Sequence, residues 1–312
     1  MKTTNRKTEP GAKRGHRRLT VPAIALAAGL TGSAVAMAET PAQRGRYLVD
    51  TILACGNCHT PKTPDGLPLP GQDLAGGGLA FDAPFFSGSA SNITPDKETG
   101  IGTWTDDEIK RAITQGVRPN HGRLAGVALA PMMWVNFYKA LTPADLDAVV
   151  AHLRAVPPVR HVVALPTYKR QIPRDPYPDA EKGFNDADMN DPVRRGAYLV
   201  TIGHCMECHT PAKEGRTQYE QALGKGGKAF GPAMVKGYPQ DWRGAVAANV
   251  TSSPQAGLGN WSDAEIKRAI TQGVSRDGRK LAPPMGFHWY AGLKSDDLGA
   301  IVAWLRTLPP RE

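Results

Sequence analysis

Two short cysteine–histidine motifs are the residues of this chain whose types and spacing suggest chemistry. In each motif two residues separate a pair of cysteines, and a histidine and Thr-Pro follow directly. Cysteines one helical turn apart can form thioethers with the two vinyl groups of one porphyrin, and the next imidazole can then bind its iron. The sequence therefore predicts two covalently attached c-type haems, with the cysteines as attachment points and the histidines as iron ligands. The motifs are Cys55-x-x-Cys58-His59 and Cys205-x-x-Cys208-His209.

Other uses of paired cysteines fit these motifs less well. Two pairs could bind one zinc ion, but zinc sites do not require a histidine directly after each pair. A thioredoxin-like dithiol would need a surrounding βαβ pattern, which the sequence lacks. Structural disulfides suit an exported chain but do not explain the repeated histidine. The haem interpretation uses all 4 cysteines of the chain.

The motifs lie within a longer internal repeat, which predicts two homologous domains at 39–159 and 191–312. The segment between them, 160–190, is rich in proline and charge and is expected to be an extended linker. Besides the motifs, the recurring segments are 44–49 with 195–200, 92–94 with 249–251, 104–117 with 261–274 and 138–146 with 290–298.

Each half is expected to contain a few helices and little strand. An opening helix precedes each cysteine motif. Capping boxes at Thr105 and Ser262 predict a second helix in each half, which a glycine then ends. The apolar spacing of 143–157 and 295–309 predicts a last helix. The predicted fold class is therefore all-α, with two tandem domains of a few helices, each packed around one covalently attached haem.

A methionine in each half is the predicted sixth ligand of the iron. Met133 aligns with Met285, five residues before an aligned tyrosine and two after a proline. A thioether there can approach the iron opposite the imidazole. Met132 is the alternative in the first half. A second histidine would instead give a bis-histidine haem. The histidines considered for this role are His121, His152, His161 and His288, and none of them has a counterpart in the other half.

Two asparagines in the repeated Asn-Ile/Val-Thr loop are candidate donors to the haem propionates. Asn92 and Asn249 occupy equivalent positions, and a buried carboxylate needs hydrogen-bond partners. Capping of the loop by the same side chains is the alternative, and the sequence leaves both open.

The first 38 residues have the composition of a secretory signal. Basic residues there account for most of the net charge of +9, which argues against a nucleic-acid-binding surface. An apolar run follows, and Ala36 and Ala38 fit the small-residue rule for cleavage after Ala38. The mature protein is expected in the periplasm and at most peripherally bound to a membrane.

The two halves resemble the mono-haem domains of the cytochrome c family, specifically those of cytochrome c subunits of bacterial periplasmic alcohol and sugar dehydrogenase complexes. The resemblance rests on Cys-x-x-Cys-His-Thr-Pro, Asn-Ile/Val-Thr, Gly-x-Gly-x-Trp-Ser/Thr-Asp-x-Glu-Ile and Pro-x-Met, and covers nearly all of 39–312. It implies a small helical fold around each haem, His59 with Met133 on one iron, and His209 with Met285 on the other. Those subunits typically carry three such haems, whereas this chain has two motifs.

Electron transfer without substrate turnover is the predicted function. Electrons would come from a periplasmic dehydrogenase or quinol-oxidising enzyme and leave to a terminal oxidase or small cytochrome. The alternative is a dihaem enzyme, such as a peroxidase or sulfur-compound oxidoreductase, with one catalytic haem. The Met132-Met133 pair opposite Pro284-Met285 is the asymmetry that motivates it, but an equivalent methionine in both halves favours the carrier. A role in tethering a dehydrogenase to the membrane is a third possibility.

Overall fold

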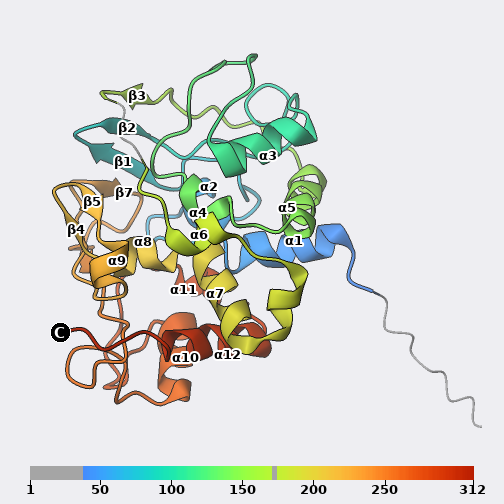
Figure 1. Ribbon diagram of the computed structural model, residues 1–312. Helices are drawn as coiled ribbons and strands as arrows, with labels where there is room; N and C mark the ends of the chain where they lie inside the picture. Colours follow the sequence, from blue (N-terminus) through green and yellow to red (C-terminus); the bar gives the residue numbers. More distant parts are fainter. Residues whose placement is uncertain (1–37, 171–173) are drawn as a thin grey trace, which may run out of the picture. The chain divides into compact units, whose positions relative to one another are not determined.

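The computed structural model describes residues 38–170 and 174–312, of which 39–312 form one compact unit (Figure 1). All but the last residue of the predicted signal segment lies outside the described residues. The helices are α1 (Pro41–Asp50), α2 (Cys55–His59), α3 (Asp106–Gln115), α4 (Val135–Tyr138), α5 (Pro143–Ala155), α6 (Pro178–Lys182), the 3-10 helix η1 (Asp186–Asn190), α7 (Pro192–Ile202), α8 (Cys205–His209), α9 (Tyr219–Ala222), α10 (Asp263–Gln272), α11 (Phe287–Tyr290) and α12 (Ser295–Leu305).

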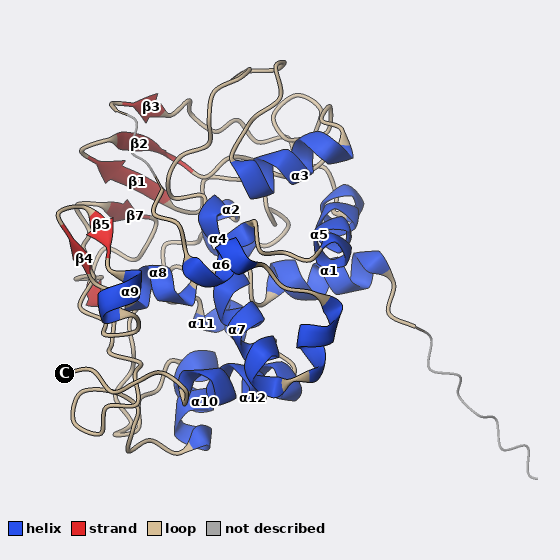
Figure 2. Ribbon diagram, viewed as in Figure 1, coloured by secondary structure: helices blue, strands red, loops and turns tan. Residues whose placement is uncertain are grey.

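The all-α fold class predicted from the sequence is wrong. Short strands pair into three small sheets, with the strand orders β3-β2-β1-β7, β4-β5 and β6-β8 (Figure 2). Most strands are only two residues long, which is too short for the alternation that marks a strand in a sequence. The strands are β1 (Ala80–Ala83), β2 (Phe86–Ser89), β3 (Thr167–Tyr168), β4 (Ala212–Lys213), β5 (Arg216–Thr217), β6 (Ala229–Phe230), β7 (Val235–Lys236) and β8 (Ala245–Val246).

The four-stranded sheet also overturns the picture of two plainly separate tandem domains. Its strands β1 and β2 come from the first repeat, β3 from the expected linker and β7 from the second repeat. Phe81 on β1 pairs with Val235 on β7, and Phe86 on β2 pairs with Tyr168 on β3. The repeats therefore share backbone hydrogen bonds, while the domain boundaries at 159 and 190 stay predictions.

The helices expected from the sequence are all present. Helices α3 and α10 begin with complete capping boxes at Thr105 and Ser262, and each ends at a glycine in the left-handed conformation, Gly116 and Gly273. The last helices, α5 and α12, start where the apolar pattern begins. Local sequence signals therefore predicted the first, the capped and the last helix of each half, while the short helices α4, α6, α9 and α11 were not expected.

Each half is built on a close crossing of its first and last helices. A Cβ atom at Gly45 on α1 would lie 1.8 Å from the carbonyl oxygen of Ala148 on α5. At Gly196 on α7 the equivalent distance, to the carbonyl oxygen of Ala300 on α12, is 2.0 Å. Only glycine allows this approach of two backbones, which explains the repeated Arg-Gly dipeptide.

Each half donates a tyrosine hydroxyl to an aspartate at the helix crossing of the other half. Arg44 on α1 binds both carboxylate oxygens of Asp145 on α5, at 2.8 and 2.9 Å. Tyr198 of the second repeat donates its hydroxyl to the same carboxylate at 2.6 Å. We call these three residues the first Arg–Asp–Tyr cluster; both repeats are needed to complete it. The second Arg–Asp–Tyr cluster consists of Arg195, Asp297 and, from the first repeat, Tyr47.

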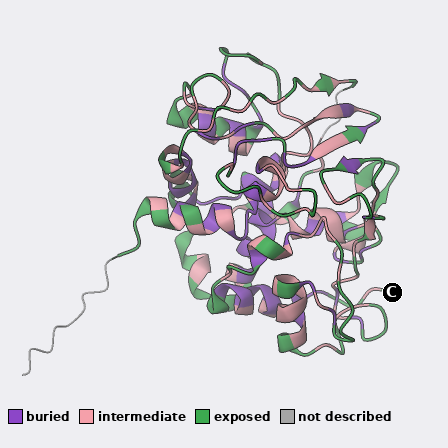
Figure 3. Ribbon diagram, turned by 180° about the vertical axis from the view of Figure 1, so that it is seen from behind, coloured by how far each residue is buried: buried purple, intermediate pink, exposed green. Residues whose placement is uncertain are grey.

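The expected linker packs against both repeats. Tyr177 is almost completely buried, and its ring lies against Phe137 of the first repeat and Tyr219 of the second. One hydrophobic core accordingly runs through both repeats, and Figure 3 shows its buried residues in purple. Within the described ranges, no helix is long and apolar enough to cross a bilayer.

Candidate haem-binding sites

Each cysteine motif forms a five-residue helix, α2 in the first repeat and α8 in the second. The residue before each helix, Ala54 or His204, has a positive φ, at 46° and 44°, and this bend turns the chain sharply out of the opening helix. Residues three apart in a helix lie on the same face. The two sulfurs of each motif therefore lie on one side of their helix, as attachment to a single porphyrin requires.

The alternatives to haem attachment find no support in the structure. All four cysteines are free thiols, so the motifs are not disulfides. Within the described residues, no group of three or more His, Cys, Asp and Glu side chains could hold a metal ion. Burial raises the pKa of Cys55, Cys205 and Cys208 to about 12. Thiols with a raised pKa stay protonated at neutral pH.

The motif histidines are held in the same way in both repeats. Nδ1 of His59 lies 2.6 Å from the carbonyl oxygen of Ser91, and Nδ1 of His209 lies 2.7 Å from that of Ala248. A carbonyl only accepts hydrogen bonds, so Nδ1 carries the proton and the lone pair resides on Nε2. Burial lowers the pKa of both rings, which keeps them neutral. The Nε2 lone pair of each imidazole is therefore available to bind iron.

A buried threonine after each histidine fixes the next loop, a role that the sequence analysis missed. The hydroxyl of Thr60 accepts a hydrogen bond from the backbone N–H of Leu74, and the hydroxyl of Thr210 accepts one from Gly224. Both threonines are completely buried. Their repetition within the motif was the signal that could have identified them.

The methionine segments lie near the cysteines of their own repeat. Met133 precedes α4 and Met285 precedes α11, both partly buried. The tyrosines that end these helices, Tyr138 and Tyr290, lie close enough to the cysteines of their own motifs for the charges to interact. These two tyrosines thus lie near the motif of their own repeat, while ligation by the methionines, and the choice between Met132 and Met133, stay predictions.

The other histidines considered as ligands have different surroundings. Nε2 of His121 faces the Glu108 carboxylate at 3.2 Å, and Nδ1 of His161 lies 2.9 Å from the carbonyl oxygen of Ala75. His288 is exposed and His152 is partly exposed. These positions give no support to a bis-histidine haem.

The two asparagines of the repeated Asn-Ile/Val-Thr loop hold their loops by hydrogen bonds. The amide of Asn92 donates to Thr99 Oγ1 and to the carbonyl oxygen of Val159, at 2.9 and 2.8 Å, and its oxygen accepts two hydrogen bonds from Thr94. Asn249 makes the equivalent bonds to Arg311 and Thr251. The hydrogen bonds match the loop-capping alternative, and the contact with propionates stays a prediction.

The motifs also contact the methionine segment of the opposite repeat. Asn57, between the cysteines of the first motif, donates to the carbonyl oxygen of Pro284 at 3.2 Å. A Cβ at Gly56 would clash with the ring of Trp289 at 2.1 Å. In the reverse direction, the ring of His204 packs against Trp134 at a centroid distance of 5.7 Å. These contacts place the two motifs next to each other.

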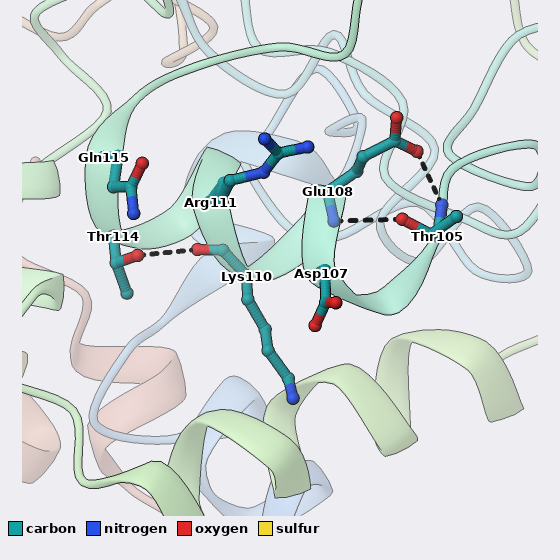
Figure 4. A pocket seen from close by; sticks show the side chains of 7 residues that line it. All are labelled: Thr105, Asp107, Glu108, Lys110, Arg111, Thr114 and Gln115. Atoms are coloured by element: carbon teal, nitrogen blue, oxygen red, sulfur yellow. Dashed lines mark hydrogen bonds between the residues drawn. The ribbon is translucent and has the colours of Figure 1, made fainter.

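A surface depression along α3 lies apart from these residues. Figure 4 shows the capping box between Thr105 and Glu108 at its rim. The depression contains none of the predicted haem residues, and its polar side chains include the capping box that begins α3. Its lining consists of Thr105, Asp107, Glu108, Lys110, Arg111, Thr114 and Gln115.

Taken together, the motif residues fit a c-type haem in each repeat. Each motif has two free thiols on one helical face and a neutral imidazole whose Nε2 is free of protein partners among the hydrogen bonds of the described residues. A covalent haem needs this donor set. Cys58 and Cys208 lie close enough for one to influence the pKa of the other.

Comparison with known proteins agrees with this chemistry. The cytochrome c family pattern matches residues 193–309. The chain is 31% identical to the fructose dehydrogenase cytochrome subunit of Gluconobacter japonicus over 92% of its own length and 58% of the relative's. It is 34% identical to the alcohol dehydrogenase (quinone) cytochrome c subunit of Gluconacetobacter polyoxogenes over 88% of its length and 58% of the relative's.

A third relative is similar in extent to the chain itself. The diheme cytochrome c-type protein of Cereibacter sphaeroides is 26% identical over 92% of this chain and 90% of the relative. By contrast, the chain spans a little over half the length of the two dehydrogenase subunits. The resemblance expected from the sequence is confirmed: residues 193–309 match the cytochrome c family, and the chain is similar over most of its length to cytochrome c subunits and to a diheme cytochrome c.

Proposed function

We propose that this protein is a periplasmic dihaem cytochrome c that relays electrons and has no substrate turnover of its own. A c-type haem supplies an iron that cycles between the ferric and ferrous states. His59 and His209, together with Met133 and Met285, would hold the iron of each haem, and the chain keeps the two motifs close together. The observation that carries the proposal is the equivalence of the two motifs, each with free thiols and an imidazole oriented by a backbone carbonyl.

The closeness of the two motifs supports a relay. Tyr290 lies near the cysteines of its own motif and also near Cys58 of the other. Both motifs also face the methionine segment of the opposite repeat. Electron transfer between cofactors needs them near each other within one rigid protein, and a shared core of both repeats provides that rigidity.

A dehydrogenase is the proposed electron donor. The related subunits from Gluconobacter japonicus and Gluconacetobacter polyoxogenes are named as parts of a fructose and an alcohol dehydrogenase. We infer that this chain accepts electrons from a periplasmic dehydrogenase or a quinol-oxidising enzyme, and passes them to a terminal oxidase or a small cytochrome. Export with cleavage after Ala38 belongs to the same proposal, because covalent haem attachment takes place outside the cytoplasm.

Haem counting and spectroscopy test the proposal. The full chain, matured in a bacterial periplasm, should carry two covalent haems by intact mass. Cys58→Ser and Cys208→Ser should each weaken the attachment of one haem. Both ferric haems should be low-spin, with a methionine–iron charge-transfer band and slow cyanide binding. A high-spin haem with rapid peroxide consumption would instead identify a dihaem enzyme.

The methionine assignment has a matched pair of variants. Met133→Leu should remove the charge-transfer band of one haem, while the neighbouring Met132→Leu should keep both bands. Met285→Leu should remove the band of the other haem. If Met132→Leu removes the band and Met133→Leu keeps it, the ligand of the first repeat is Met132.

A further inference from the structure

A partly buried lysine lies against each cysteine motif, and the two lysines come from different places in the repeats. Nζ of Lys62, three residues after His59, donates to the carbonyl oxygen of Asn57 and lies 3.5 Å from that of Gly78. Nζ of Lys228 donates to the carbonyl oxygen of Glu207 at 2.5 Å. Asn57 and Glu207 are equivalent positions, directly before the second cysteine of each motif. Both ammonium groups therefore sit at the same place on their attachment helix.

The second lysine is neutralised by a carboxylate. Nζ of Lys228 lies 2.8 Å from Oε1 of Glu207, and the side chains are only 18% and 16% exposed. The other oxygen of that carboxylate accepts a hydrogen bond from the hydroxyl of Tyr219 at 2.5 Å. Glu207 thus cancels the charge of Lys228 within the motif itself.

The first lysine has no such partner. Asn57 supplies a neutral amide where the second motif has a carboxylate, and Lys62 forms no ion pair with any described residue. Its ammonium faces the ring of Tyr238 at 5.5 Å, a contact that favours the cation. Burial lowers the pKa of Lys62 to about 8. Attachment of haem at Cys58 replaces its thiol by an uncharged thioether.

One further charged side chain, Asp50, acts on the first motif. Asp50 influences the pKa of Cys55, but its carboxylate is paired with Arg46 at 3.4 Å. The charged side chains that influence Cys208 are Glu207 and Lys228 alone, apart from other cysteines. Among the lysines and the residues before the second cysteines, the first repeat therefore carries one positive charge that the second cancels by its Lys228–Glu207 ion pair.

We propose that the unpaired Lys62 gives the first haem a higher reduction potential than the second, where Glu207 cancels Lys228, so that electrons pass from the second repeat to the first. A positive charge disfavours ferric iron relative to ferrous iron, because the ferric state carries one more unit of positive charge. The proposal rests on the two-haem function above and adds a direction to it. Lys62 acts here through charge and touches no reacting atom.

Coulomb's law sets the size of the effect. Two unit charges about 10 Å apart in a medium with an effective dielectric constant of about 20 change the ratio of ferrous to ferric iron by roughly tenfold. For a one-electron couple a tenfold change corresponds to about 59 mV. Such a difference is large enough to separate two steps in a redox titration.

An optical redox titration of the mature, haem-loaded full chain tests the proposal. We expect two steps, with Lys62→Met lowering the upper step by roughly tenfold in the ferrous-to-ferric ratio. Lys97→Met is the matched control, because it removes the same charge from an exposed side chain, and it should shift either step by less than about twofold. Glu207→Gln keeps the side-chain shape, leaves Lys228 unpaired and should raise the lower step.

The outcomes separate this inference from the proposed function. If the protein carries two haems by mass but both share one potential, the inference is wrong and the dihaem carrier stands. The same holds if the potential shift in Lys62→Met is no larger than that in Lys97→Met. A shift of the lower step in Lys62→Met would also overturn it. One haem by mass would refute the dihaem function itself. If Lys62→Met does not mature, a Glu207→Gln variant that leaves the lower step in place contradicts the inference independently.

Discussion

Removal of one hydroxyl group, in Tyr198→Phe, should weaken both halves of the protein together. The ring of Tyr198 on α7 is completely buried, and its hydroxyl donates to Asp145 on α5 at 2.6 Å. That carboxylate belongs to the other repeat and is itself only 7% exposed. Phenylalanine keeps the packing of the ring and removes only this hydrogen bond. The variant therefore measures one contact across the boundary between the repeats.

The structure sets the expected magnitude. A hydrogen bond to a charged group contributes about 1.5–3 kcal/mol. Arg44 continues to bind both oxygens of Asp145 in the variant, at 2.8 and 2.9 Å, so the carboxylate stays paired. We therefore expect the lower part of this range, about 1.5–2 kcal/mol of the free energy of unfolding.

Urea denaturation of the mature, haem-loaded protein is the assay. Far-ultraviolet circular dichroism and haem absorption should report one transition, with its midpoint at lower urea and its slope unchanged. Tyr177→Phe is the matched control: this tyrosine is equally buried, and its hydroxyl has no hydrogen-bond partner in the described part of the chain. Because Tyr177→Phe removes a buried hydroxyl that has no partner there, the control should lose no stability. Equal effects of the two variants, or two transitions of which only one moves, would refute the reasoning.

Three further predictions concern pH, packing and the repeated asparagine. Burial lowers the pKa of His204 from 6.5 to about 4, so the unfolded chain binds a proton at this ring between pH 6.5 and about 4 that the folded chain does not. The free energy of unfolding should therefore fall by up to about 1.4 kcal/mol per pH unit as the pH drops through this range. Urea denaturation at several pH values should find a smaller pH dependence in His204→Ala. Gly196→Ala should cost about 1–3 kcal/mol or prevent folding, since its Cβ would meet the Ala300 carbonyl at 2.0 Å, and an unchanged melting temperature would contradict the close crossing. Asn92→Ala should destabilise by about 2–4 kcal/mol with both haem potentials retained; a shifted potential in redox titration would instead favour the propionate contact.

The cysteine–histidine chemistry and the longer helices could be predicted from residues close together in the chain. The spacing in Cys55-x-x-Cys58-His59 is a property of one helical turn, so no tertiary contact was needed to recognise it. The capping box at Thr105 and the glycine that ends its helix act within a few residues. Each of these local patterns also occurs a second time in the chain, which strengthens its interpretation. Such features are encoded by neighbours in the chain, and for this reason they could be predicted.

The way the two repeats combine could not be predicted from the sequence. The pairing of β1 with β7 joins segments far apart in the chain, each too short to carry a strand pattern. The exchange of tyrosines between the Arg–Asp–Tyr clusters is likewise absent from either repeat alone. Lys62 and Lys228 occupy different positions in their repeats, yet the fold brings both to the same place on the motif. These contacts join residues with no local relation in the sequence, so their geometry follows from packing of the whole chain.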